Sequence, residues 1–161
     1  MCTLTLIRLA INTDTWKQVD FPSGDVTVIT LEEDWGKLML SNAYIEGNSN
    51  NTITQLKHFY RSHPDIVKNL VTGIVHTMWV GDFYRHHKHW DNHNDTCLFT
   101  VEATAASEYL IDAAAALGLE MTLPSGIPIH LYNVIKKWSK LDQVFISDHF
   151  TDLIEFCDIE T

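Results

Sequence analysis

Residues 73–95 read GIVHTMWVGDFYRHHKHWDNHND, and the stretch changes from apolar to polar and histidine-rich at Gly81-Asp82. Residues 73–80 are apolar nearly throughout and form a short run, which is typical of a central strand buried on both faces. The polar residues 85–96 predict a loop that leaves the end of this strand, a place where proteins often carry functional side chains. Asp82 is therefore the first candidate, because a strand end fixes the backbone while the carboxylate faces a cleft. The alternative is that Asp82 only caps backbone N–H groups of a turn.

The sequence on both sides of this strand predicts further strands and helices. The β-branched run 25–31 and the alternating run 37–45 predict a hairpin. Helical spacing of apolar residues predicts one helix from about Asn48 to His63-Pro64 and another over 104–117, closed by Gly118. The remaining expected elements are a strand over 1–14, a short helical piece over 64–70, strands over 127–135, 141–146 and 152–156, and a basic loop over 136–140. Strands and helices alternate only in part, so the expected class is α/β or α+β with a mixed sheet.

The composition excludes several classes of protein. The 161 residues, 45% hydrophobic and 20% charged, are typical of one globular domain. A formal net charge of −10 disfavours binding to nucleic acid or anionic membranes by charge alone. No stretch approaches the roughly 18 apolar residues of a membrane span, so no membrane partner is expected. The three cysteines form no CxxC pair, which fits a reducing, intracellular compartment and leaves nucleus or cytoplasm open.

Two further pairs of residues are candidates for chemistry. Asn42 and Tyr44 lie two apart on a predicted strand, so both project to one face, where an amide and a phenol could contact a phosphate. The alternative is an ordinary pair on a sheet surface. Asp148-His149 has the appearance of an acid–base dyad with Asp142 as its partner. Adjacent side chains of an extended segment point to opposite faces, however, so Asp148 and His149 would not touch.

The histidine-rich loop is a candidate transition-metal site. His86, His87, His89 and His93 carry imidazoles, which are common zinc or copper ligands. Their spacing is not accompanied by a second Cys or His pair, as zinc sites of known type require. The alternative is a polar loop whose imidazoles are hydrogen-bonded or solvated.

A resemblance to a known family emerges from several stretches taken in order. These are LSNAY at 40–44, HTMWVGDFYRHHKHWD at 76–91, LPSGIPIH at 123–130 and KKWSKLDQVFISDH at 136–149. Together they resemble the endonuclease/exonuclease/phosphatase superfamily of DNase I and the apurinic endonucleases, and most of all the endonuclease domains of fungal non-LTR retrotransposons. The resemblance covers nearly the whole chain. It implies an α+β fold (an α/β sandwich), part of a DNase I-like four-layer arrangement with two stacked mixed sheets flanked by helices.

The resemblance also implies an activity and roles for particular residues. Members of the family hydrolyse phosphodiesters with Mg²⁺, so the implied cofactor is Mg²⁺ and the implied partner is DNA. Asp82 matches the acid that orients the attacking water or helps to hold the metal. Tyr44 matches the tyrosine that contacts the scissile phosphate, and Asn42 accompanies it. Asp142 matches the acid that orients the catalytic histidine.

The sequence departs from the family pattern in three places. Tyr84 stands where the family has Asn, and a phenol is bulkier and a poor magnesium ligand. No counterpart of the family's first Asn strand or its metal-binding Glu strand is found. Ser147-Asp148-His149 matches a surface turn, not the family's S/T-D-H-x-P-I string, so Asp148 and His149 are not expected to be catalytic. The resemblance therefore implies that residues 1–161 are a single partial domain without its N-terminal and C-terminal catalytic strands, inactive or nearly so alone.

Two other functions stay open at this point. The first is a non-enzymatic remnant that acts as an interaction or binding module, because unpaired sheet edges and an uncovered apolar face favour self-association. The second is a His-rich transition-metal-binding protein. For a DNA partner, the basic-aromatic cluster of Lys136, Lys137, Trp138 and Lys140 is the obvious contact, and a solvated loop is its alternative.

Overall fold

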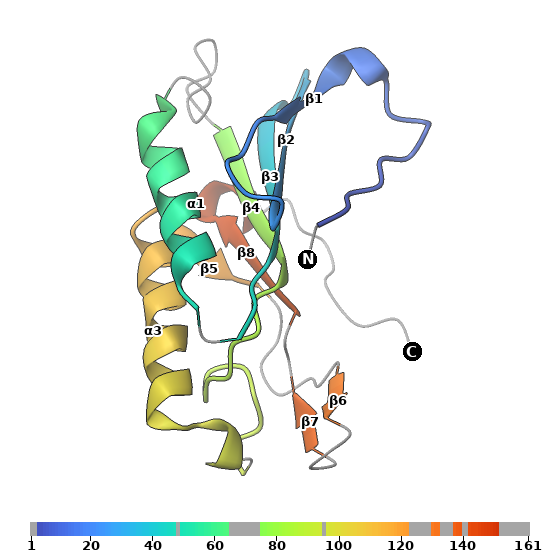
Figure 1. Cartoon of the computed structure of the whole chain (residues 1–161). Helices are drawn as coiled ribbons and strands as arrows, with labels where there is room; N and C mark the ends of the chain where they lie inside the picture. The colour runs from blue at the N-terminus through green and yellow to red at the C-terminus, as the bar shows by residue number, and fades with distance from the viewer. Residues whose placement is uncertain are drawn as a thin grey trace.

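A mixed six-stranded β-sheet organises the chain (Figure 1). The computed structural model describes residues 3–47, 49–64, 75–94, 96–122, 130–132, 137–139 and 142–151. The sheet has the order β1 (Trp16–Val19), β2 (Val26–Glu33), β3 (Gly36–Tyr44), β4 (Val75–Asp82), β8 (Asp142–Ser147) and β5 (Leu119–Met121). The β3–β4 pair is parallel and the others are antiparallel, which confirms the predicted mixed sheet and the α+β class.

Two long helices cover one face of this sheet (Figure 1). They are α1 (Asn51–Ser62) and α3 (Val101–Ala115), while the short α4 (Asp148–Thr151) directly follows β8. Buried side chains of the strands and helices interlock in this core, among them Met39, Trp79, Phe145, Leu56 and Leu110. In the described part of the chain, no helix is long and apolar enough to cross a membrane.

The sequence accounts for the ends of both long helices. At α3, the Thr100 side chain accepts a hydrogen bond from the Ala103 N–H, and Gly118 closes the C-terminal turn at φ +68°, as predicted. Helix α1 ends at Ser62, directly before His63-Pro64, because the residue before proline disfavours the helical conformation. Both predicted helices are confirmed.

The strand predicted over residues 1–14 is wrong. Residues 3–8 belong to no strand, and the chain instead forms a short 3₁₀ turn, η1 (Thr13–Thr15), followed by β1. The residues alternate between partly buried and exposed, as a strand would, but Leu4 and Leu6 are 76% and 86% exposed. β-propensity alone makes no strand where no neighbouring strand supplies ladder hydrogen bonds.

The C-terminal third agrees with the sequence in part. The prediction of a strand over 141–146 is confirmed by β8, whereas the expected strand 127–135 is described only as β6 (His130–Tyr132). The basic loop expected over 136–140 contains a strand, β7 (Lys137–Ser139), which pairs with β6 as a separate two-stranded sheet. A second 3₁₀ turn, η2 (Thr96–Leu98), and strand β5 were not foreseen. The pieces expected over 64–70 and 152–156 lie outside the described residues, apart from Pro64.

Gly81 allows strands β3 and β4 to approach closely. Its φ is +132°, and a Cβ built on it would overlap the carbonyl oxygen of Ala43, its partner in β3. Every other amino acid carries that Cβ, so only glycine fits. Gly36 has almost the same φ, +130°, but a Cβ there would meet nothing within 4 Å.

This pair of glycines predicts two different stability losses. We expect Gly36→Ala to lower the free energy of unfolding by about 1–2 kcal/mol, because only the backbone conformation is disfavoured. We expect Gly81→Ala to lower it by about 3 kcal/mol or more, because steric overlap adds to the same backbone cost. Urea denaturation of both variants beside the wild type measures the difference. Equal losses would show that the close approach to Ala43 is unimportant.

Candidate functional site

Three of the residues singled out from the sequence lie in one row across the sheet. Tyr44 is the register partner of Asp82 in the parallel β3–β4 pair, and Asp82 is the partner of Asp142 in the antiparallel β4–β8 pair. Partners in neighbouring strands have Cα atoms only about 4.5–5.5 Å apart, and their side chains project to the same face. Residues far apart in sequence thus form one row, defined here as the edge row: Tyr44, Asp82 and Asp142.

The edge row lies on the face of the sheet opposite α1 and α3. Side chains alternate along a strand, and the neighbouring positions Ala43 and Gly81 belong to the buried, helix-covered side. Tyr44 and Asp82 are half-buried and Asp142 is exposed, so a solvent molecule can reach the row. Asp82 and Tyr44 each stand at the last residue of a strand, and Asp142 at the first residue of its strand.

Asn42 shares this face but is occupied by the N-terminal residues. Its Nδ2 donates to the Leu4 carbonyl oxygen at 3.1 Å and to the Thr5 hydroxyl at 3.2 Å. Thr3 is fixed beside it, because its amide donates to the Gly24 carbonyl oxygen at 3.0 Å. In the structure, Asn42 therefore anchors residues 3–5 across the sheet face.

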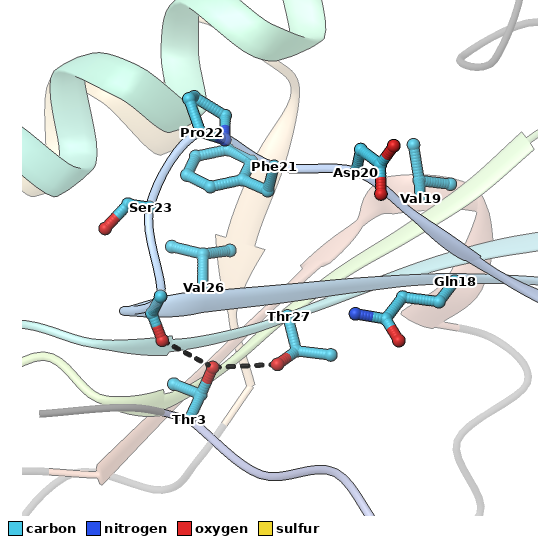
Figure 2. Close-up of a pocket in the computed structure, with 10 residues that line it drawn as sticks. Thr3, Gln18, Val19, Asp20, Phe21, Pro22, Ser23, Val26 and Thr27 are labelled. Carbon is cyan, nitrogen blue, oxygen red and sulfur yellow. Dashed lines mark hydrogen bonds between the residues drawn. The ribbon is translucent and has the colours of Figure 1, made fainter.

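A pocket of about 430 Å³ lies beside this anchor (Figure 2). It is formed by Thr3 and the connection between β1 and β2, including Asp20, Pro22 and Ser23. The hydroxyls of Thr3 and Thr27 lie 2.8 Å apart at its edge (Figure 2). The pocket lies on the strand next to Tyr44, whose amide donates to the Asp25 carbonyl oxygen.

Tyr84 adopts an unusual backbone conformation directly after Asp82. Its φ is +47°, in the left-handed region that disfavours side chains other than Asn, Asp and Gly. Asp82 Oδ1 accepts a hydrogen bond from the Tyr84 N–H at 2.9 Å, so the carboxylate stabilises this turn. The family resemblance places Asn at this position, and asparagine is among the residues that tolerate such a φ best.

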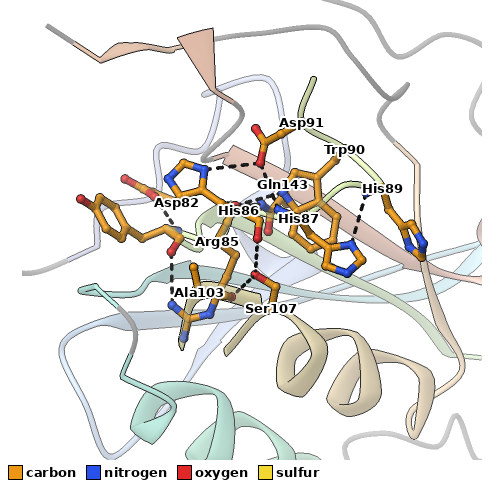
Figure 3. A network of polar contacts seen from close by, with 11 residues as sticks. Asp82, Arg85, His86, His87, His89, Trp90, Asp91, Ala103, Ser107 and Gln143 are labelled. Atoms are coloured by element: carbon orange, nitrogen blue, oxygen red, sulfur yellow. Dashed lines mark hydrogen bonds and ion pairs between the residues drawn. The ribbon is translucent and has the colours of Figure 1, made fainter. Parts of the chain in front are cut away.

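The guanidinium of Arg85 is buried (Figure 3), and it connects the two strand ends. Arg85 is 1% exposed, and it donates to the carbonyl oxygens of Gly47, Ser49 and Tyr84 and to Asn50 Oδ1. Asn50 is the N-cap residue of α1, and its side chain serves Arg85 instead of capping the helix. Burial lowers the pKa of the Arg85 guanidinium to about 10. Arg85 thus fixes the segment after Tyr44 against the segment after Asp82.

The following loop is closed by Asp91 and Trp90 (Figure 3). Asp91 Oδ2 accepts from the His87 N–H at 3.1 Å and lies 3.4 Å from His86 Nδ1. Trp90 Nε1 and Gln143 Nε2 both donate to the Arg85 carbonyl oxygen, at 3.0 and 3.2 Å. The RHH-x-x-W motif is therefore a structural support behind the edge row.

The histidines of this loop do not form a metal site in the described residues. No group of three or more His, Cys, Asp or Glu side chains there is arranged to hold a metal ion. His87 is buried, its Nδ1 accepts from the His89 N–H, and His93 is exposed. The described geometry therefore favours the hydrogen-bonded loop over the transition-metal site of His86, His87, His89 and His93.

The surroundings of His87 favour its neutral form. Burial lowers the pKa of the His87 imidazole below its ordinary value of 6.5, and the nearby charges of His89 and Lys88 lower it further. Glu108 and Asp91 act in the opposite direction more weakly. The hydrogen bond from His89 N–H to Nδ1 at 3.2 Å also requires an unprotonated nitrogen.

This environment predicts a loss of stability in mild acid. Below its ordinary pKa of 6.5, His87 binds a proton in the unfolded chain but not in the folded one, so stability falls as pH drops. We expect wild type to lose more stability between about pH 7.5 and about pH 5.5 than His87→Asn, whose Oδ1 replaces the Nδ1 acceptor. Urea denaturation at both pH values measures this. His93→Asn is the control, and it should keep the wild-type slope; an unchanged slope in His87→Asn would contradict the assignment.

The edge row suits a magnesium ion only in part. Mg²⁺ prefers oxygen donors and in many enzymes takes one or two protein carboxylates, with water and substrate phosphate completing its shell. Asp82 and Asp142 are two such carboxylates in adjacent register. Since no third acidic, His or Cys side chain joins them within the described ranges, they fit an ion shared with a phosphate, not one enclosed by protein.

The structure separates Asp148-His149 from the edge row. Strand β8 begins at Asp142 and ends at Ser147, so Asp148 starts α4 at the other end of the strand. Six residues of strand span about 20 Å. Asp148 therefore lies far from Asp142, on the side where the Ser147 hydroxyl accepts from the Thr77 N–H.

Sequence reasoning missed the residues that support the site. Arg85, Asp91 and Gln143 are all buried and polar, and each makes hydrogen bonds that hold the loop after Asp82. Their hydrogen-bond partners come from distant parts of the chain, which local periodicity does not reveal. The one signal in the sequence is Arg85, a charged residue three positions after the end of a buried strand.

Comparison with known proteins shows the fold. No protein-family model matches the sequence, and no curated protein matches it. The solved endonuclease domain of TRAS1, a telomere-specific non-LTR retrotransposon, is similar with a TM-score of 0.61 and 17% identity over 88% of this chain. This similarity shows an endonuclease/exonuclease/phosphatase-type fold, as the sequence resemblance implied. The chain spans 60% of the length of that domain.

Two other solved structures have lower similarity scores. The catalytic domain of human Nocturnin has a TM-score of 0.45 and 13% identity, covering 85% of this chain and 50% of that one. An endonuclease/exonuclease/phosphatase family protein from Bacteroides thetaiotaomicron has a TM-score of 0.43 and 11% identity, covering 84% and 53%.

Proposed function

We propose that this chain, with its endonuclease-type fold, is the central part of a Mg²⁺-dependent, phosphodiester-cleaving DNA endonuclease domain of retrotransposon type, and that it is inactive or nearly so by itself. The edge row carries this proposal. Tyr44, Asp82 and Asp142 were singled out from sequence motifs separated by about 40 and 60 residues, and they occupy adjacent register positions. If these residues only capped turns or covered the sheet surface, nothing would require them to occupy adjacent register positions.

Each residue of the edge row has a role in this proposal. Asp82 accepts the proton of the attacking water or shares the metal ion, and the Tyr84 N–H bond to its Oδ1 fixes the carboxylate. The Tyr44 hydroxyl donates to a non-bridging oxygen of the phosphodiester. Asp142 supplies a second negative charge next to Asp82, which favours a shared cation. Mg²⁺, when bound, would stabilise the charge that develops on the phosphoryl oxygens.

Two features of the chain support weak or absent cleavage. A phenol at Tyr84 replaces the small amide that the family resemblance implies, and phenols are poor magnesium ligands. The described residues also supply only two carboxylates to the edge row, so a metal ion would be held loosely. Asn42, the fourth predicted site residue, donates its side-chain N–H groups to the Leu4 carbonyl oxygen and the Thr5 hydroxyl.

The β6–β7 sheet lies next to the edge row in sequence. Strand β7 carries Lys137 and Trp138 and is separated from Asp142 by only two residues. In Figure 1 this two-stranded sheet projects beyond the end of the large sheet where β8 begins. The basic-aromatic cluster predicted from the sequence, Lys136, Lys137, Trp138 and Lys140, belongs to this proposal, because a chain with net charge −10 needs local positive charge to bind a DNA backbone.

The proposal is tested by binding and cleavage together. We expect a fluorescein-labelled DNA oligonucleotide to bind more tightly in Mg²⁺ than in EDTA, and Asp82→Asn to weaken the Mg²⁺-dependent part about tenfold, because a charged ligand of the cation is lost. Fluorescence anisotropy measures binding, and nicking of supercoiled plasmid measures cleavage. Asp112→Asn, an exposed substitution on α3, is the matched control and should change neither.

The two readouts test different parts of the proposal. We expect no nicking above background from wild type or Asp82→Asn. Mg²⁺-dependent nicking that disappears in Asp82→Asn would overturn the claim of inactivity and keep the endonuclease assignment. Binding that is indifferent to Mg²⁺ and to Asp82 would overturn the assignment of the edge row to a phosphodiester.

A second candidate function is an interaction module, and the open face of the sheet favours it. The face opposite α1 and α3 carries two buried isoleucines, Ile29 and Ile146. Around them lie half-buried apolar side chains from β2, β3, β4 and β8, which are Leu31, Leu38, Leu40, Met78, Val80 and Val144. The strands at the two edges of the sheet are β1 and β5. Apolar surface of this kind favours association with another copy of the chain.

Self-association has a direct test. We expect size-exclusion chromatography with light scattering to give a dimer or larger species, and Leu40→Glu to shift it toward monomer, because a carboxylate in the contact must be desolvated. Glu108→Gln on the exposed surface of α3 is the control and should leave the oligomer unchanged. A monodisperse wild-type monomer with a cooperative thermal transition would refute this candidate.

A further inference from the structure

Tyr84 is the one non-glycine residue with positive φ in the described part of the chain. Its φ of +47° is sterically unfavourable for a residue with a large side chain. Strained residues persist where the surroundings fix them, and they gather at functional sites. The strain at Tyr84 therefore indicates that its surroundings fix the residue and that its side chain has a function.

Contacts on both sides of Tyr84 hold its backbone in place. Asp82 Oδ1 accepts from its N–H at 2.9 Å, and the Arg85 guanidinium donates to its carbonyl oxygen at 3.2 Å. Its ring lies edge-on to the His86 imidazole, with 6.3 Å between ring centroids and 61° between planes. The backbone is thus fixed on both sides of the residue, and the phenol has a defined direction.

Tyr84 lies directly next to the edge row. Its amide is bonded to the carboxylate of Asp82, the middle member of the row, and its side chain is half-exposed. Tyr44 lies in register with Asp82 on the neighbouring strand. Two tyrosines consequently flank one carboxylate, one across the strand and the other two residues further along the chain.

We propose that Tyr84 is a stacking residue that makes the edge row selective for unpaired DNA. An aromatic side chain can cover the face of a nucleobase only where that base is not stacked between neighbours, as in single-stranded or melted DNA. In this assignment the phosphate lies at Tyr44, Asp82 and Asp142, and the adjacent base rests on the Tyr84 ring. The inference rests on the proposed function, because it names the substrate class of the same site.

A small amide at this position would not do this. Asparagine would relieve the backbone strain, since it tolerates the left-handed region, but it has no aromatic face. Tyr84 keeps the strain and has an aromatic ring of about the size of a pyrimidine base beside the proposed phosphate position. The negative charges of Asp82 and Asp142 repel a DNA backbone, so binding through this face depends on a divalent cation.

The test compares one oligonucleotide as a single strand and as a blunt duplex, in Mg²⁺, by fluorescence anisotropy. We expect wild type to bind the single strand more tightly than the duplex. Tyr84→Phe keeps the ring and should stay within about twofold of wild type, whereas Tyr84→Asn should lose about tenfold or more on the single strand and about twofold or less on the duplex. Tyr109→Asn on α3, where the tyrosine hydroxyl contacts Thr54, is the control for loss of a surface tyrosine.

Two further measurements keep the result interpretable. Urea denaturation should show that Tyr84→Asn is at least as stable as wild type, because the strain is relieved. A single strand containing 5-iodouracil, irradiated in the complex, should form its cross-link at Tyr84, which peptide mass spectrometry locates.

Each outcome decides the matter. Tyr84→Asn that leaves the single-strand affinity unchanged, or lowers single-strand and duplex affinity equally, overturns the stacking role and leaves the proposed function intact. A loss in Tyr84→Phe equal to that in Tyr84→Asn assigns binding to the hydroxyl and also overturns stacking. Absence of Mg²⁺-dependent binding to either DNA by wild type overturns the proposed function and this inference with it.

Discussion

The site depends on the close, parallel approach of β3 and β4 at Gly81. The Gly81 backbone comes so near the Ala43 carbonyl oxygen that no Cβ fits between them. One residue further along, this approach places Tyr44 beside Asp82, and the Ile45 N–H continues the pairing by donating to the Asp82 carbonyl oxygen at 2.8 Å. A wider spacing would separate the phenol from the carboxylate. The edge row thus depends on the register of β3, β4 and β8 and on a glycine at position 81 of β4.

Behind the edge row, buried polar groups keep the two strand ends in place. The Arg85 guanidinium is desolvated, which is unfavourable for a charge, and carbonyl oxygens of two separate segments compensate for the lost water. Asp91 does the same for the next turn, because its carboxylate accepts from the His87 N–H. Tyr84 links this network to the edge row, because its N–H donates to Asp82 Oδ1 and its carbonyl oxygen accepts from Arg85. The position of the edge row therefore depends on the buried hydrogen bonds of Arg85.

The sequence predicted the elements that local pattern determines. A β-branched run and an alternating run of apolar and polar residues predicted β2 and β3. Helical spacing of apolar residues and capping residues predicted α1 and α3, and a short apolar run predicted β4. The prediction from sequence was wrong where pairing with another segment determines whether a strand forms. Residues 3–8 have strand-like composition but belong to no strand of the described chain, whereas β7 forms in a basic stretch because β6 pairs with it. For the site, motif resemblance supplied Tyr44, Asp82 and Asp142, and only the register showed that they share a row. The positive φ of Tyr84 was not predictable, because tyrosine is a residue that local rules would exclude from that conformation.

The two faces of the sheet differ in how fully their side chains are buried. The face that contributes most to stability is therefore not the face that carries the edge row. On the helix-covered face, Met39, Trp79 and Leu110 are fully excluded from solvent, so a large part of the apolar burial lies there. The opposite face, which carries the edge row, also buries Ile29 and Ile146, but it leaves residues such as Leu40 and Val80 half-buried. A sheet stabilised mainly from one side can tolerate change on the other, including the strained Tyr84 beside Asp82. The buried residues of the helix-covered face, such as Met39 and Trp79, are therefore distinct from Tyr44, Asp82 and Asp142, so substitutions in the edge row leave that part of the core intact.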